Sequence, residues 1–172
     1  DNANATVGLS LAELRHRDLL PFAAVIHRTP VIQVSNAVYA AYDGVTPAVE
    51  LQQVVGGLLR KRMRYGGVVM TGDLAATAPV LGETVGTAAV HALQAGSDLL
   101  YVSGGPTQQE QAYGAVLRAV HSGRIARDRL ELSVLRVLAL KRRYGLRSQV
   151  PPKPKPSRPK PPPKPAKGKQ KP

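Results

Sequence analysis

The sequence predicts an α/β fold with a parallel sheet, because short apolar runs alternate with longer segments of helical periodicity. Three of these runs, at 30–35, 68–70 and 98–102, are each followed by a helical pattern. The 172 residues, 43% of them hydrophobic, are enough for one compact domain with a core. We therefore expect three strand–helix units with right-handed crossovers, preceded by one helix and followed by another.

The first helix is predicted from Ser10 to near Arg28. Ser10 and Glu13 have the spacing of a capping box, in which each side chain accepts a hydrogen bond from the backbone at the helix start. Pro21 is expected to interrupt this helix, because proline has no backbone N–H to donate.

The first strand covers 30–35, and a loop is predicted from Asn36 to Thr46. Thr46 then caps the second helix, with Pro47 at its first helical position. Four basic residues occupy the last turn of this helix, where positive charge interacts favourably with the helix dipole: Arg60, Lys61, Arg62 and Arg64. We prefer this explanation of the cluster to a nucleic-acid-binding patch.

The second strand, Val68–Met70, ends in a predicted turn through Thr71, Gly72 and Asp73. Functional residues of α/β proteins gather at the carboxyl ends of parallel strands, so Asp73 is the first candidate site residue. A helix cap or a turn is the alternative role for an Asp in this position.

The remaining elements are a helix at 83–94, a strand at 98–102 and a helix at 106–123. The last helix is predicted from Asp128 to Gly145, with Asp128 and Glu131 as its capping pair. Its many leucines and valines indicate a helix that is largely buried or docks on a partner.

Several segments together resemble glycoside hydrolase family 3, in particular its bacterial β-N-acetylhexosaminidases. They occur in order from about Leu9 to about Leu146: Asp18-Leu-Leu-Pro-Phe22, Val34-Ser-Asn-Ala-Val-Tyr39, Asp43-Gly44, Thr46-Pro-Ala48, Leu58-Leu-Arg60, Tyr65 to Leu74, and Ala92-Leu-Gln-Ala-Gly-Ser-Asp98. The resemblance implies the carboxyl-terminal part of a (β/α)8 barrel of the TIM type, about three strand–helix units long. Three strands cannot close such a barrel, so the missing amino-terminal half, or a partner chain, is expected to complete it.

The chain departs from the family at its catalytic positions. The family shows two acidic residues before the leucine that matches Leu74, and the first of them is the nucleophile. Here Gly72 occupies that position, and Asp73 follows it. Residues 1–8 contain no histidine, whereas the family takes its acid/base from a His and an Asp upstream of Asp18, and its Lys-His element is also absent. These departures, and a first residue that is not Met, predict a fragment or a catalytically impaired chain.

Two further candidate site residues follow the first strand. Ser35 and Asn36 should face the same end of the sheet as Asp73, where a contact with a sugar hydroxyl is one role and a turn or cap is the other. No metal site is predicted, because none of the four histidines, at 16, 27, 91 and 121, has a His or Cys partner at ligand spacing. The resemblance likewise implies no metal or organic cofactor.

The last 23 residues differ in composition from the rest. Residues 150–172 hold seven Lys, one Arg, ten of the fifteen Pro and no acid, and thus +8 of the net charge of +13. This composition predicts a disordered, basic tail after a domain at 1–149. The tail is a solvated spacer or a binding segment for an anionic polymer. No apolar run approaches the roughly 20 residues that a membrane-spanning helix needs.

Two functions from different classes remain open at this stage. The first is glycoside hydrolysis of N-acetylglucosamine-containing glycans, in the bacterial cytoplasm or cell envelope by resemblance. The second is a non-catalytic remnant that binds carbohydrate or a partner and uses the basic tail for an anionic surface.

Overall fold

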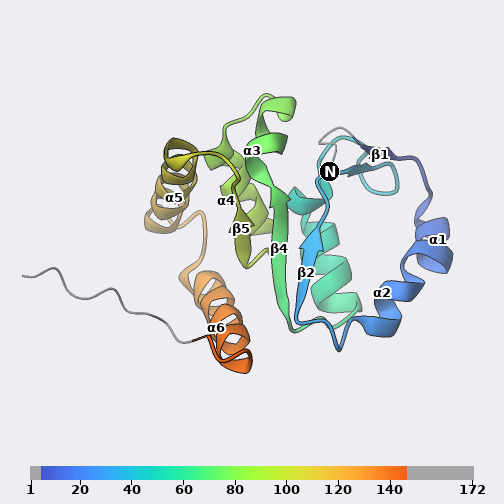
Figure 1. The fold of residues 1–172 in the computed structure, drawn as a ribbon. Coiled ribbons are helices and arrows are strands. Elements are labelled where there is room, and N and C mark those ends of the chain that lie inside the picture. Colours follow the sequence, from blue (N-terminus) through green and yellow to red (C-terminus); the bar gives the residue numbers. More distant parts are fainter. Residues whose placement is uncertain (1–4, 147–172) are drawn as a thin grey trace, which may run out of the picture.

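The computed structural model describes residues 5–146 and contains the predicted three-stranded parallel sheet. Its strands are β2 (Val31–Val34), β4 (Val68–Asp73) and β5 (Leu99–Tyr101), in the order β2-β4-β5 (Figure 1). All neighbouring strands run parallel. The predicted domain boundary at 149 and the tail at 150–172 lie outside the described residues.

One face of the sheet carries the main core. Ile32 of β2 pairs in register with Val69 of β4, and both are buried, as is Val34. In Figure 1 the helices η3 (Gln53–Arg62) and α4 (Val85–Ala95) lie behind the strands. α4 supplies small buried side chains to the same core: Ala88, Ala89, Ala92 and Ala95. A helix α5 (Pro106–His121) then packs on the outside of α4.

The other face of the sheet is only partly covered. Gln33 of β2, Met70 of β4 and Leu99 of β5 are partners in register and therefore project to one side. Gln33 is exposed, and Met70 and Leu99 are half-buried. The sheet thus has one face with a complete hydrophobic core and one that its own helices leave partly open.

The amino-terminal region agrees with the predicted capping box and break. Helix α1 (Leu11–Glu13) begins with the Ser10 amide donating to Glu13 Oε2 at 2.8 Å and the Glu13 amide donating to Ser10 Oγ at 3.2 Å. The π-type helix η1 (Leu14–Asp18) follows, and α2 (Leu20–Val25) restarts with Pro21 in its first turn.

Two predictions for the next segment are wrong: the loop at 36–46 and the start of the second helix at Thr46. β3 (Val38–Tyr39) lies inside that loop and pairs in parallel with β1 (Thr6–Val7). Thr46 does not cap a helix. Pro47 bridges to Val38 and leads into a short 3-10 helix, η2 (Ala48–Glu50), after which the chain is extended at Leu51. Two-residue strands and a tertiary bridge leave no periodic pattern in the sequence.

The second strand is longer than predicted. Thr71, Gly72 and Asp73 were expected to form a turn, but they continue β4, because Asp73 pairs with Tyr101 of β5. The Tyr101 amide also donates to Thr71 Oγ1 at 2.9 Å. The short helices α3 (Leu74–Thr77) and η4 (Ala78–Leu81) follow without an intervening loop.

The last helix, α6 (Arg127–Arg143), packs by its polar side. Ala126 occupies its N-cap position without a side-chain hydrogen bond, so the predicted Asp128–Glu131 capping pair is wrong. Ser133 is its buried residue, whereas four of its apolar residues are exposed: Leu132, Val134, Leu135 and Leu138. The expectation of a largely buried apolar helix is therefore wrong, and its docking on a partner stays a prediction.

Candidate functional site at the carboxyl end of the sheet

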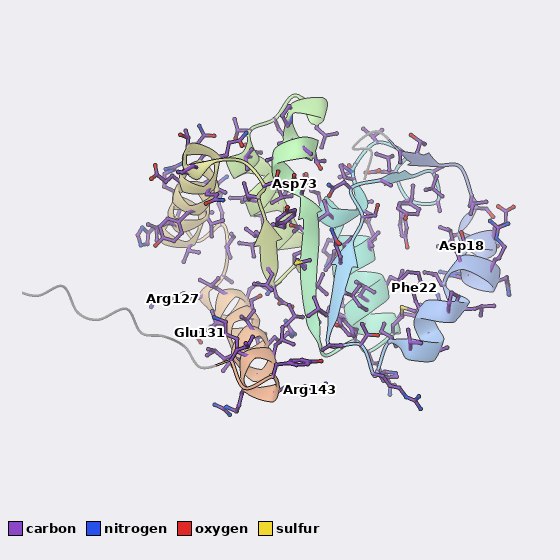
Figure 2. All side chains as sticks on the ribbon, viewed as in Figure 1. Asp18, Phe22, Asp73, Arg127, Glu131 and Arg143 are labelled. Atoms are coloured by element: carbon purple, nitrogen blue, oxygen red, sulfur yellow. The ribbon has the colours of Figure 1, made fainter. Side chains whose placement is uncertain are left out.

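Asp73 ends β4 and is the N-cap of α3, so the strand and the helix together fix its carboxylate. Its Oδ1 accepts hydrogen bonds from the Ala75 amide at 3.1 Å and the Ser103 amide at 3.0 Å. Its Oδ2 accepts a hydrogen bond from the Ser103 hydroxyl. Ser103 follows β5, so the Asp73 carboxylate joins the carboxyl ends of two neighbouring strands. Figure 2 shows Asp73 at the end of β4 that lies away from α6.

These contacts keep Asp73 ionised. Partial burial acts to raise the pKa of Asp73, but the hydrogen bonds from the Ser103 side chain, the Ser103 amide and the Ala75 amide lower it by more. The pKa therefore lies below its ordinary value. The carboxylate is available as an anion, but both of its oxygens are already engaged by the protein.

Gly72 and Asn36 share one small space beside Asp73. Asn36 is buried, and its Nδ2 donates to the Asp73 carbonyl oxygen at 3.1 Å. A Cβ atom at position 72 would meet the Asn36 side-chain amide at only 2.5 Å, so a residue larger than glycine requires Asn36 to move. Within the described part of the chain, Asn36 Oδ1 has no hydrogen-bond partner.

The three candidates from the sequence thus come to one end of the sheet. Asn36 contacts the backbone of Asp73 directly. Ser35 Oγ accepts a hydrogen bond from the Ala37 amide at 3.0 Å, which is the local turn role that the sequence left open. A retaining glycosidase needs two carboxyl groups about 5–5.5 Å apart. Asp73 supplies one carboxyl group at this edge, and its hydrogen-bond partners there are Ser103 and Ala75.

A second polar cluster lies at the opposite end of the sheet. Asp98 is fully buried and accepts hydrogen bonds from the Val69 amide at 3.0 Å and the Ser133 hydroxyl at 2.7 Å. Arg60 and Arg136 also pair with it. Arg60 lies in the last turn of η3, as predicted, and its guanidinium group also pairs with the buried Asp98. This network attaches α6 to the sheet, which is a structural role.

Two carboxyl groups and a histidine meet on the helical side of the molecule. His91 Nδ1 lies 3.0 Å from Glu50 Oε2 and 3.4 Å from Glu83 Oε2. Burial is the largest cause that raises the pKa of Glu50 to about 8, and the hydrogen bond and negative charge of Glu83 add to it. The sequence showed no ligand partner for His91, because Glu50 is 41 residues away and only the packing of η2 on α4 brings the two together.

The protein is therefore an α/β protein built of β/α units. Its candidate site, around Asp73, lies at the carboxyl ends of the parallel strands. The family model described as "Glycosyl hydrolase family 3 N terminal domain" matches residues 2–140. The chain therefore belongs to glycosyl hydrolase family 3. That description refers to the amino-terminal domain of the family and does not assign the chain to the carboxyl-terminal part of the barrel.

Two curated relatives and a solved structure are similar to this chain. A secreted glycosyl hydrolase of Arthroderma benhamiae is 31% identical over 139 residues, covering 80% of this chain and 39% of the relative. A β-hexosaminidase of Methylococcus capsulatus is 31% identical over 116 residues, covering 65% of this chain and 32% of the relative. The family 3 β-N-acetylglucosaminidase of Paenibacillus sp. superposes with a TM-score of 0.78 at 37% identity, covering 85% of this chain and 28% of that one.

The chain thus spans well under half the length of these relatives. None of the helices within residues 5–146 is both long enough and apolar enough to cross a membrane.

Proposed function

We propose that this chain forms the carboxyl-terminal part of a family 3 (β/α)8 barrel of the β-N-acetylhexosaminidase type. A part of such a barrel should have parallel strands, helices on one face of its sheet and an opposite face that becomes the barrel interior. This chain has three parallel strands, helices on one face and a partly open opposite face. The remaining strands then come from further sequence of the same protein or from a partner chain. The similarity to 28% of the Paenibacillus enzyme supports this proposal.

The substrates of the completed barrel are N-acetylglucosamine-containing glycans, bound at the edge that carries Asp73, Asn36 and Ser35. No cofactor takes part in this proposal. The relatives are named as a β-hexosaminidase and a β-N-acetylglucosaminidase, which supports this substrate class.

Hydrolysis by this site is strongly impaired. The observation that carries this conclusion is the state of Asp73, whose two carboxylate oxygens accept hydrogen bonds from Ser103 and Ala75. In a retaining glycosidase the nucleophilic carboxylate attacks the anomeric carbon, whereas the hydrogen bonds of Asp73 orient its carboxylate toward Ser103 and Ala75. The preceding position holds Gly72, and Asn36 occupies the space that a side chain there would need. A displacement of about 1 Å from the productive geometry can cost a hundredfold in rate.

The test measures hydrolysis of a chromogenic N-acetyl-β-glucosaminide by the chain joined to the amino-terminal barrel strands of the Paenibacillus relative. We expect very little turnover from this chimera. Gly72→Asp combined with Asn36→Ser should raise turnover at least about tenfold, because it supplies the missing carboxylate and frees its space. Gly72→Asp alone should gain less. A high rate in the unmodified chimera would contradict the impaired site, and no gain in the double variant would contradict the assignment of position 72.

A second candidate function is glycan or partner binding without hydrolysis, which the filled space at Gly72 and Asn36 favours. It predicts that the chimera binds a chito-oligosaccharide, measured by calorimetry, but does not cleave it.

For residues 150–172 the same proposal predicts retention on heparin that is lost when this segment is deleted. Unchanged retention after the deletion would contradict the proposal that residues 150–172 bind an anionic polymer.

A further inference from the structure

The cluster of Glu50, Glu83 and His91 is separate from the edge that carries Asp73. Glu50 ends η2, His91 lies in the middle of α4, and Glu83 stands between η4 and α4. Each residue offers one donor atom, and these three atoms all lie within 4.8 Å of one another. Residues from three segments thus converge on one point.

The spacing of the donor atoms suits a bound metal ion. His91 Nδ1 lies 3.0 Å from Glu50 Oε2 and 3.4 Å from Glu83 Oε2. The ligand atoms of a tetrahedral zinc ion, with bonds of about 2.0–2.2 Å, are about 3.3–3.5 Å apart. The two distances from His91 are therefore within a few tenths of an ångström of this spacing, and all three donor atoms lie within 4.8 Å of one another.

The burial of the two carboxyl groups is an independent observation. The Glu50 side chain is 5% exposed and the Glu83 side chain 15% exposed. In the part of the chain that the structure describes, Oε1 of each is buried and has no hydrogen-bond partner. Buried carboxylate oxygens are costly unless a hydrogen bond or a cation compensates them, and a bound cation would compensate the charge of these two side chains.

The cluster can be reached from solvent on the histidine side. The His91 side chain is 47% exposed, and it lines a surface cavity of about 380 Å³ together with Thr84 and Thr87. An ion can enter by this route, and water can complete its coordination there.

We propose that Glu50, Glu83 and His91 bind a divalent transition-metal ion of the zinc type. One imidazole nitrogen and two carboxylate oxygens are ligands that Zn²⁺ accepts, and two carboxylates balance its charge. The ion would hold η2 and the start of α4 together. It therefore serves as a structural link on the helical side and takes no part in chemistry at Asp73.

The test titrates Zn²⁺ into the untagged, chelator-treated 172-residue chain by calorimetry and follows thermal unfolding with and without Zn²⁺. We expect one strong site and a Tm that rises by several degrees with the ion. His91→Ala and Glu50→Gln should each weaken this site at least about tenfold and remove most of the rise in Tm. Two matched control variants change exposed residues of the same types outside the cluster: His16→Ala and Glu110→Gln.

Equal Zn²⁺ affinity in the unmodified chain and in His91→Ala would overturn the proposal, because the ion would then sit elsewhere. Absence of a Zn²⁺-dependent rise in Tm would also overturn it and would leave the two carboxyl groups sharing a proton. Circular dichroism checks that each variant folds, and His91→Gln replaces His91→Ala if the latter does not. X-ray absorption of the zinc-loaded chain should show one imidazole and oxygen ligands at about 2.0–2.2 Å.

Discussion

At position 72, a single residue removes the carboxylate that the family resemblance expects at the catalytic site. Gly72 stands where the resemblance puts a catalytic carboxylate, and the buried Asn36 amide fills the space beside it. Asn36 in turn donates to the backbone of Asp73. The three positions therefore form one packed unit, in which a residue larger than Gly72 requires the Asn36 side chain to move.

Gly72→Ala should destabilise the fold by about 1–3 kcal/mol, because the new methyl group overlaps the Asn36 amide. Gly66→Ala is the matched control, since a Cβ at Gly66 meets nothing within 4 Å. Urea denaturation measures both free energies of unfolding. Adding Asn36→Ala to Gly72→Ala should recover part of the loss, and equal effects of the two single glycine variants would refute this steric coupling.

Asp73→Asn should reduce stability by about 1 kcal/mol at pH 7, because it removes a charged acceptor of the Ser103 and Ala75 hydrogen bonds. The pKa of Asp73 is lowered in the folded state, so its charge stabilises the fold above the unfolded pKa of about 3.9. This contribution is lost as the pH falls through the lower, folded pKa. The difference between the unmodified chain and Asp73→Asn, followed by thermal unfolding from pH 7 to pH 3, should therefore shrink below about pH 4. A difference that grows toward acid would contradict the pKa direction.

At the scale of the elements, α6 is attached to the sheet through charge and not through its leucines. Asp98 precedes β5, and Arg136 and Ser133 of α6 reach it at 3.1 Å and 2.7 Å. A carboxylate without exposure to water needs these partners, which explains why the polar side of α6 faces inward.

Asp98→Asn should destabilise the chain by about 3–5 kcal/mol, because it leaves Arg60 and Arg136 without their buried counter-charge. Chemical denaturation measures the loss, and Glu110→Gln on the exposed surface of α5 is the control. A loss below about 1 kcal/mol would mean that the network behaves as a surface salt bridge.

At the scale of the whole molecule, the sheet and α6 are two of the regions where apolar surface remains outside the core. Met70 and Leu99 are half-buried on the partly open face of the sheet. On α6, Leu135 is 61% exposed and Leu138 is 47% exposed. Neighbouring exposed apolar groups favour association, which agrees with the proposal that further barrel strands or a partner complete the structure.

The isolated chain should therefore self-associate as its concentration rises, and Leu135→Lys with Leu138→Lys should reduce this association. Sedimentation velocity over a concentration series measures the effect, and circular dichroism should show an unchanged fold. Tyr113→Lys on α5, where the side chain is also exposed, is the control. Association that is independent of the two leucines would place the contact on another surface.

Local signals in the sequence predicted the secondary elements that carry them. The apolar runs Val31–Val34 and Val68–Met70 predicted two of the parallel strands, and Ser10 with Glu13 predicted a capping box that the structure contains. The order of family motifs pointed to the family that the comparison shows. These predictions succeed because their physical causes act within a few residues.

Contacts between distant residues were decided by the tertiary structure alone. Asp73 became part of β4 because β5 pairs with it, and α6 turned its polar side inward because Asp98 is buried there. The meeting of His91 with Glu50 depends on how η2 packs against α4. The sequence by itself determined the fold class, the positions of the three strands of the main sheet and the family, since periodicity and motifs are properties of the linear sequence. Which side chains share a site was decided by packing, since buried charges and close approaches depend on neighbours far away in sequence.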